Sequence, residues 1–204
     1  MSKNIMYEYI IDIPIGGELK KHIIELAKIS SEYDNIYSEI YNNYKNKKNV
    51  VHITLKYWFI VENEKTKLFD ELKELTNKQK TFNVKINNIK TFNNSNQFVI
   101  FADVNRYKTG NNFIKKFMSI LSKYDFVTWE KTDDKINGAI PHSTIAIVKE
   151  PSNIQPKKFI KLLKTKFKKS RGEVLGIRIR RRLINTKTNK KGTKELFKFF
   201  KFKK

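Results

Sequence analysis

The order of secondary structure that the sequence predicts runs twice through the chain. Alternating apolar residues predict strands, and apolar residues three and four apart predict helices. In the first half they predict strand, helix, strand, helix and strand at 7–15, 19–44, 50–60, 68–75 and 82–86. The second half repeats this order at 97–104, 113–124, 142–148, 159–167 and 175–179. A repeat of this kind predicts a single domain, residues 1–204, of the α+β class with two lobes, about 1–93 and 94–204.

Two segments need a separate interpretation. Ser30 and Ser31 indicate a break in the long first helix, because serine competes with the helical backbone for hydrogen bonds. The C-terminal stretch KELFKFFKF alternates poorly. It is either a last strand, paired through a turn around Asn189 to Gly192, or a charged tail.

Composition excludes several classes of protein. The chain has 204 residues, 39% of them hydrophobic, which is enough for one buried core. It has no cysteine, so disulfides, thiolate metal sites and a cysteine nucleophile are excluded. No apolar run reaches the ~20 residues of a membrane span, and no secretion signal or glycine-rich phosphate loop is present. From the lack of a span and a signal we expect a cytoplasmic protein with no membrane attachment, which we take to be a monomer. The acidic residues lack ligand spacing, so we expect no metal, and no cofactor is expected either.

The net charge is strongly positive, at +23 with a pI near 10.0. Such a field favours a polyanionic partner, here RNA or an oligonucleotide. The lysine excess has a second explanation, because the chain is rich in Lys, Asn and Ile, as AT-rich genomes tend to produce. Five of the six arginines, however, lie between positions 171 and 182. Strand alternation places Arg178, Arg180 and Arg182 on one face, which is either a row of guanidinium groups for an RNA backbone or a solvated face.

Two of the three histidines occupy equivalent positions in the repeat, in the segments HITL and HSTI. Side chains alternate along a strand, so His52 shares a face with Thr54, and His142 with Thr144. A pair of imidazoles can supply one base and one acid near neutral pH, and threonine hydroxyls can donate to phosphate oxygens. One histidine on a strand is usually structural, but this repetition favours catalysis. His22 has no counterpart, so we expect it to be packed.

These segments resemble the motifs of the 2H phosphoesterase superfamily. The stretch HITLKYWF is similar to the first motif of its 2′-5′ RNA ligase-like branch, and PHSTIAIV to the second. The resemblance implies antiparallel-rich sheets that line a central cleft, with helices outside. It also implies His52 and His142 as catalytic residues, Thr54 and Thr144 as phosphate-binding hydroxyls, and metal-independent cleavage of 2′,3′-cyclic phosphates or 2′-5′-linked oligonucleotides. The long first helix and the arginine-rich strand leave the subfamily open.

Three further residues are candidates for substrate binding. Alternation places Lys56 and Trp58 on the face of the first histidine motif. Lys56 could contact a phosphate, and Trp58 could either stack on a base or pack in the core. Trp129 lies in the polar stretch before the second motif, where a loop would rim the cleft.

Other functions stay open at this point. A non-catalytic RNA-binding module would have the same fold and basic surface, although binding alone does not require two matched histidines. Hydrolysis of cyclic nucleotide signals would fit the same site. A metal-dependent nuclease is disfavoured, since the carboxylates do not cluster. The sequence does not determine which histidine is the base.

Overall fold

The computed structural model describes residues 5–59, 64–94, 97–105, 107–124, 142–149, 156–185, 187–188 and 190–203. Its helices are α1 (Gly17–Tyr33), η1 (Asn35–Tyr37, 3-10), α2 (Ser38–Lys45), α3 (Lys65–Asn77), α4 (Tyr107–Leu121) and α5 (Pro156–Lys166). Its strands are β1 (Ile5–Pro14), β2 (His52–Phe59), β3 (Phe82–Asn94), β4 (Gln97–Asn105), β5 (His142–Lys149), β6 (Arg171–Val174), β7 (Gly176–Asn185), β8 (Lys190–Lys191) and β9 (Glu195–Lys201). The repeated order of elements is confirmed.

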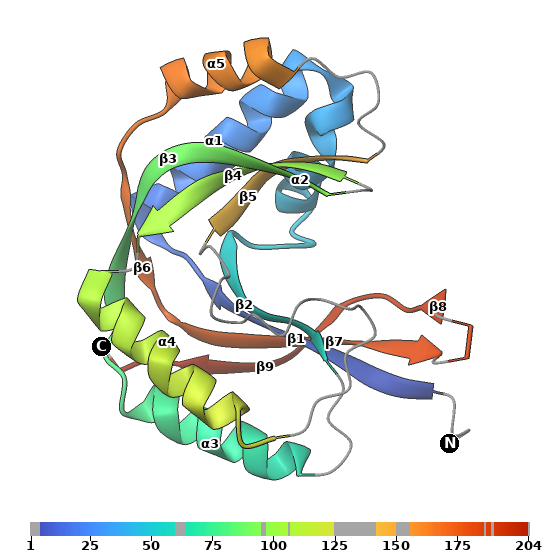
Figure 1. Ribbon diagram of the computed structural model, residues 1–204, viewed down its shortest axis with the longest axis vertical. Coiled ribbons are helices and arrows are strands. Elements are labelled where there is room, and N and C mark those ends of the chain that lie inside the picture. Colours follow the sequence, from blue (N-terminus) through green and yellow to red (C-terminus); the bar gives the residue numbers. More distant parts are fainter. Residues whose placement is uncertain are drawn as a thin grey trace.

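The strands form two antiparallel sheets that curl toward each other (Figure 1). The first sheet has the order β2-β1-β7-β8, with β9 also paired to β7, and the second has the order β5-β4-β3-β6. Helices α3 and α4 lie outside the first sheet, and α1 and α5 lie outside the second (Figure 1). The predicted α+β fold with antiparallel sheets and outer helices is therefore confirmed.

Each sheet contains strands from both repeats. Strand β7 pairs with β1, with Asp12 opposite Arg178, and β3 pairs with β4. The third strand of each repeat thus lies beside the first strand of the other. The chain passes from one sheet to the other between β6 and β7, at Leu175 and Gly176. A boundary near residue 93 therefore divides the chain into its two repeats, but the two sheets do not follow this division.

The break in the first helical segment lies later than expected. Helix α1 continues through Ser30 and Ser31, because their hydroxyls donate to the carbonyls of Leu26 (2.8 Å) and Lys28 (2.9 Å) inside the helix. The break falls at Asp34, whose carboxylate accepts from the amide of Ile36 at 3.0 Å. At the other end of the chain, β9 confirms the last strand rather than a charged tail.

One apolar cluster joins the helices to the outer faces of the sheets. Its fully buried members include Leu19 and Ile23 of α1, Leu72 of α3 and Phe117 of α4. Side chains of β1 alternate, so Tyr9, Ile11 and Ile13 face this core, while Ile10 and Asp12 lie on the opposite face of the sheet. Within the described ranges, no helix combines the length and apolar character needed to cross a bilayer.

Candidate active site

The first histidine motif begins β2. His52 lies opposite Pro14 of β1, and Thr54 lies opposite Asp12. Directly paired residues of an antiparallel sheet share a face, so Thr54 and Asp12 project to the same side, and alternation adds His52 to them. This inner face of the first sheet carries the candidate catalytic residues.

The ring of His52 has a defined orientation. Its Nδ1 donates to the backbone carbonyl of Val50 at 2.6 Å. Because a carbonyl oxygen only accepts, Nδ1 carries the proton and Nε2 is the nitrogen left for chemistry. Burial lowers the pKa of His52 to about 4; Asp12 acts against this shift, whereas Arg180 and Arg178 add to it. At pH 7 this imidazole is neutral, as a general base must be.

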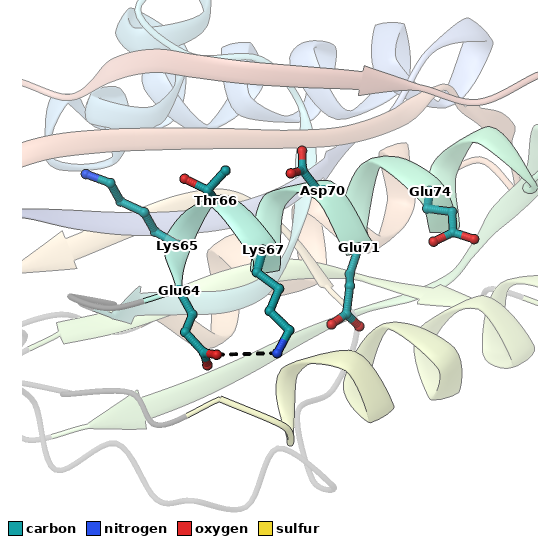
Figure 2. Close-up of a pocket in the computed structure, with 7 residues that line it drawn as sticks. All are labelled: Glu64, Lys65, Thr66, Lys67, Asp70, Glu71 and Glu74. Atoms are coloured by element: carbon teal, nitrogen blue, oxygen red, sulfur yellow. Dashed lines mark hydrogen bonds and ion pairs between the residues drawn. The ribbon is translucent and has the colours of Figure 1, made fainter.

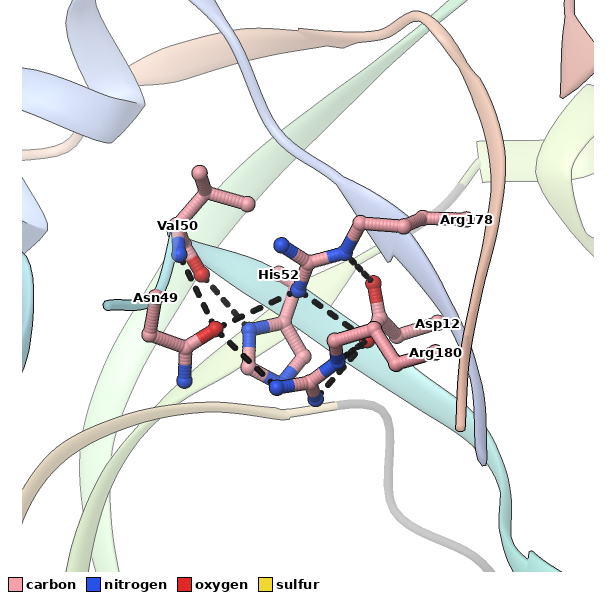
Figure 3. A network of polar contacts seen from close by, with 6 residues as sticks. All are labelled: Asp12, Asn49, Val50, His52, Arg178 and Arg180. Atoms are coloured by element: carbon pink, nitrogen blue, oxygen red, sulfur yellow. Dashed lines mark hydrogen bonds and ion pairs between the residues drawn. The ribbon is translucent and has the colours of Figure 1, made fainter. Parts of the chain in front are cut away.

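Two arginines of β7 surround a buried carboxylate next to His52 (Figure 3). Asp12 accepts from Nε and Nη2 of Arg178, at 2.7 and 3.0 Å, and from Nε of Arg180 at 3.0 Å. Asp12 has no exposed surface, and Arg178 and Arg180 are only 9% and 7% exposed. The solvated-face interpretation of these two arginines is therefore wrong, because both side chains are buried and paired with Asp12.

Asn49 connects this cluster to the backbone that orients His52 (Figure 3). Its side-chain oxygen accepts from Arg178 at 3.3 Å, from Arg180 at 3.4 Å and from the amide of Val50 at 2.9 Å. The carbonyl of Val50 is in turn the acceptor for the imidazole. Hydrogen bonds and the backbone of Val50 together therefore link Asp12 to His52.

The second histidine motif begins β5 in the other sheet. His142 lies opposite Asp103 of β4, and Thr144 lies opposite Phe101. The imidazole of His142 contacts the rings of Phe101 and Phe92, with centroids 5.0 and 5.7 Å apart. These pairings place His142, Thr144 and the two phenylalanines on one face of the second sheet.

Contacts between the sheets bring the two motifs toward each other. Strands β2 and β5 are in contact. Tyr44 of α2 donates from its hydroxyl to the carbonyl of Thr144 at 3.1 Å. Burial raises the pKa of Tyr44, and Ser143 and the Arg178 guanidinium act in the opposite direction. The Tyr44 hydroxyl thus lies near both the second motif and the arginine cluster beside the first.

Comparison with known proteins agrees with this geometry. The family model described as the 2′-5′ RNA ligase superfamily matches residues 26–183, which include both motifs. The chain belongs to the 2′-5′ RNA ligase superfamily. The expected relationship to 2H phosphoesterases is confirmed, and this membership supports RNA phosphodiesterase activity in general terms. No curated protein sequence matches the chain significantly.

Solved structures show the same fold. TT0787 of Thermus thermophilus has a TM-score of 0.61 at 11% identity, over 96% of this chain and 97% of that one. Apo LigT of E. coli has a TM-score of 0.57 at 11% identity, over 97% and 98% of the two chains. Usb1 of Kluyveromyces marxianus with uridine monophosphate has a TM-score of 0.51 at 11% identity, over 99% and 100%. Proteins with very different sequences therefore share this architecture.

Other residues predicted for this superfamily member fall partly outside the described structure. The backbone of Lys56 and Trp58 lies in β2, but their side chains lie outside the described part, and Trp129 lies outside the described residues altogether. Their binding roles stay predictions. His22 is buried, accepts from the amide of Lys168 at 3.0 Å and packs against Phe167, so its packing role is confirmed.

The site also contains four residues that the sequence did not predict, namely Asp12, Asn49, Tyr44 and Phe92. Only Asp12 left a signal, because it is a carboxylate inside the otherwise apolar stretch IIDIPI, and a buried charge requires a partner. Asn49 and Tyr44 occur in a polar, asparagine-rich stretch without distinctive spacing. Their place in the site follows from contacts between distant segments.

A depression of about 870 Å³ lies against α3, on the outer side of the first sheet (Figure 2). Three of its acidic groups have basic partners, since Glu64 pairs with Lys67, Glu71 with Lys123 and Glu74 with Lys78. Within the described ranges, no three His, Asp or Glu side chains are grouped as metal ligands would be. The depression is lined by Glu64, Lys65, Thr66, Lys67, Asp70, Glu71 and Glu74.

Proposed function

We propose that the protein is a metal-independent phosphodiesterase that cleaves RNA-type phosphodiesters, either 2′,3′-cyclic phosphates or 2′-5′-linked oligonucleotides. The observation that carries this proposal is the state of His52. Its Nδ1–H is held by the Val50 carbonyl, its pKa is about 4, and its Nε2 therefore has a lone pair at neutral pH. A second histidine motif contacts the same region from the other sheet.

The proposed reaction uses the two histidines in different roles. For a 2′,3′-cyclic phosphate, water attacks phosphorus while His52 Nε2 takes the water proton. The bond between phosphorus and one ribose oxygen breaks, and His142 supplies the proton that this oxygen needs. Thr54 and Thr144 donate to the non-bridging oxygens. Each proton transfer typically contributes ~10²–10⁴ in rate.

The substrate class rests on charge and on the relatives. A net charge of +23 favours a polyanion. E. coli LigT, with a TM-score of 0.58 at 12% identity, was solved with 3′-AMP, and Usb1 was solved with uridine monophosphate. In this proposal Lys56 contacts a phosphate, while Trp58 and Trp129 contact bases, and the enzyme acts as a cytoplasmic monomer.

A substrate panel with excess EDTA tests the proposal. It contains 2′,3′-cyclic AMP, 2′-5′-linked and 3′-5′-linked diadenosine phosphates, and 3′,5′-cyclic AMP. We expect turnover of 2′,3′-cyclic AMP or of the 2′-5′-linked compound to continue in EDTA, and we expect His52→Ala to lose this turnover. Strict dependence on Mg²⁺ or Mn²⁺ would favour a metal-dependent nuclease. Preferential cleavage of 3′,5′-cyclic AMP would favour signal hydrolysis, and RNA affinity without turnover would favour a binding module.

A further inference from the structure

The cluster of Asp12, Arg178 and Arg180 contains more buried charge than folding explains. One fully buried carboxylate accepts from two guanidinium groups in a place with almost no solvent contact. Replacing buried ion pairs by apolar side chains is often neutral or stabilising, so stability alone gives little reason for the cluster. Its location is informative, because the charges of all three residues act on His52.

Asn49 connects this cluster to the backbone segment that orients His52. The segment between α2 and β2 is not a regular helix or strand, so the helical and strand ladders do not hold it. The Asn49 side-chain oxygen binds both guanidinium groups and the Val50 amide (Figure 3). The same peptide segment presents the Val50 carbonyl to His52 Nδ1 at 2.6 Å.

We infer that Asn49 is a positioning residue, which with Asp12 and the two arginines keeps His52 in one orientation, protonated on Nδ1. The importance of this positioning role for catalysis rests on the proposed function, whereas the orientation of the His52 imidazole does not. The network would hold the base in one tautomer and one orientation before substrate binds. Arg178 and Arg180 would then act through His52 rather than by contact with an RNA backbone.

The charged and titratable groups around His52 come from several elements. Asp12 of β1 raises its pKa, while Arg178 and Arg180 of β7 lower it. Tyr44 of α2 lies within the field of Arg178, and His142 is the first residue of the adjacent β5. Because opposite charges act on one imidazole, changing a single charge should shift its titration in a predictable direction.

Three variants separate orientation from charge. Asn49→Asp has the same shape and can keep all three acceptor contacts but adds a negative charge, so it should raise the pKa of His52. Arg180→Gln removes a positive charge while Arg178 still pairs with Asp12, so it should also raise that pKa. Asn49→Ala removes the acceptor and should release the Val50 peptide. Asn46→Ala, at an exposed position in the same turn, is the matched control.

The experiment records imidazole ¹⁵N shifts of the free protein as a function of pH. The chain has three histidines, so His52→Gln assigns the signal directly. We expect the wild type and Asn46→Ala to show Nδ1–H alone and a midpoint near 4. Asn49→Asp and Arg180→Gln should move the midpoint upward, and Asn49→Ala should show a mixture of tautomers. With 2′,3′-cyclic AMP, Asn49→Ala should lower kcat by up to about 10²-fold with KM unchanged.

Two results would overturn the inference. One is an Asn49→Ala protein with the wild-type tautomer and midpoint. The other is an Asn49→Asp protein whose activity falls while the acid limb of its profile of kcat against pH stays where it is in wild type. A merely structural role of Asn49 would give that result. If the ¹⁵N shifts respond as expected but no phosphodiester is cleaved, the proposed function fails and the positioning role stands.

Discussion

At the scale of single residues, the two candidate catalytic histidines have different surroundings. His52 donates to a peptide carbonyl and lies within the field of a charged cluster, whereas His142 contacts the rings of Phe101 and Phe92. A pair of chemically different environments suits a base and an acid that must act together. His22 provides a comparison, because it is buried but belongs to the helical core.

Substitution of either motif histidine should separate catalysis from binding. We expect His52→Ala and His142→Ala to lower kcat on 2′,3′-cyclic AMP by roughly 10²-fold or more, because each removes one proton transfer. RNA affinity, measured by fluorescence anisotropy, should stay close to wild type. His22→Gln serves as the control with full turnover. An equal loss of affinity and rate would contradict a catalytic role.

The pKa of His52 also predicts how stability depends on pH. Its folded value, about 4, lies below the ordinary value of 6.5, so the unfolded chain binds this proton more readily. The stabilising contribution is complete above pH 6.5 and is lost as the pH falls toward 4. Between pH 6.5 and 4, the free energy of unfolding measured in urea should fall by roughly 1–3 kcal/mol less for His52→Gln than for wild type. Parallel curves for both proteins would argue against the low pKa.

At the scale of elements, the passage from β6 to β7 determines how the two sheets join. Gly176 begins β7 beside β9, and a Cβ added there would lie 2.1 Å from the carbonyl oxygen of Phe200. The arginines of the site follow immediately on β7, so a displacement here would move the register of Arg178 against Asp12.

Gly176→Ala should therefore destabilise the protein by about 1–3 kcal/mol, as overpacking typically does. The matched control is Gly192→Ala, where the nearest atom to an added Cβ, the Leu183 carbonyl oxygen, is 3.4 Å away. Urea denaturation midpoints measure both variants. Equal stability of the two would show that β9 moves aside without cost.

At the scale of the whole molecule, the net charge of +23 and the buried arginines have separate consequences. Lysines on the surface can release counterions when RNA binds, but guanidinium groups already paired with Asp12 cannot do so readily. Strand alternation alone would support contact of Arg178 and Arg180 with an RNA backbone. Because both side chains are buried, we no longer expect that contact.

We expect Lys47→Gln with Lys48→Gln, in the exposed turn before β2, to reduce the slope of log affinity against log salt. Each lost phosphate contact should reduce it by about 0.7–0.9. The matched variant, Arg178→Gln with Arg180→Gln, should leave the slope nearly unchanged while lowering turnover. A salt titration of RNA affinity decides between them, and a larger slope change for the arginine variant would place those groups on the RNA backbone.

The sequence by itself determined the α+β class, the duplicated order of elements and the two histidine motifs. These features are local, because periodicity within ten residues specifies an element and a repeated HxT segment needs no distant partner. Alternation also assigned Arg178 to a face of its strand. Only the tertiary structure decided that this face is covered. It brings Arg178 Nε within 2.7 Å of the carboxylate of Asp12, which lies 166 positions away in the chain. It also makes Asn49 the link between this pair and His52. Pairing between distant strands creates such contacts, and no local pattern in the sequence encodes it.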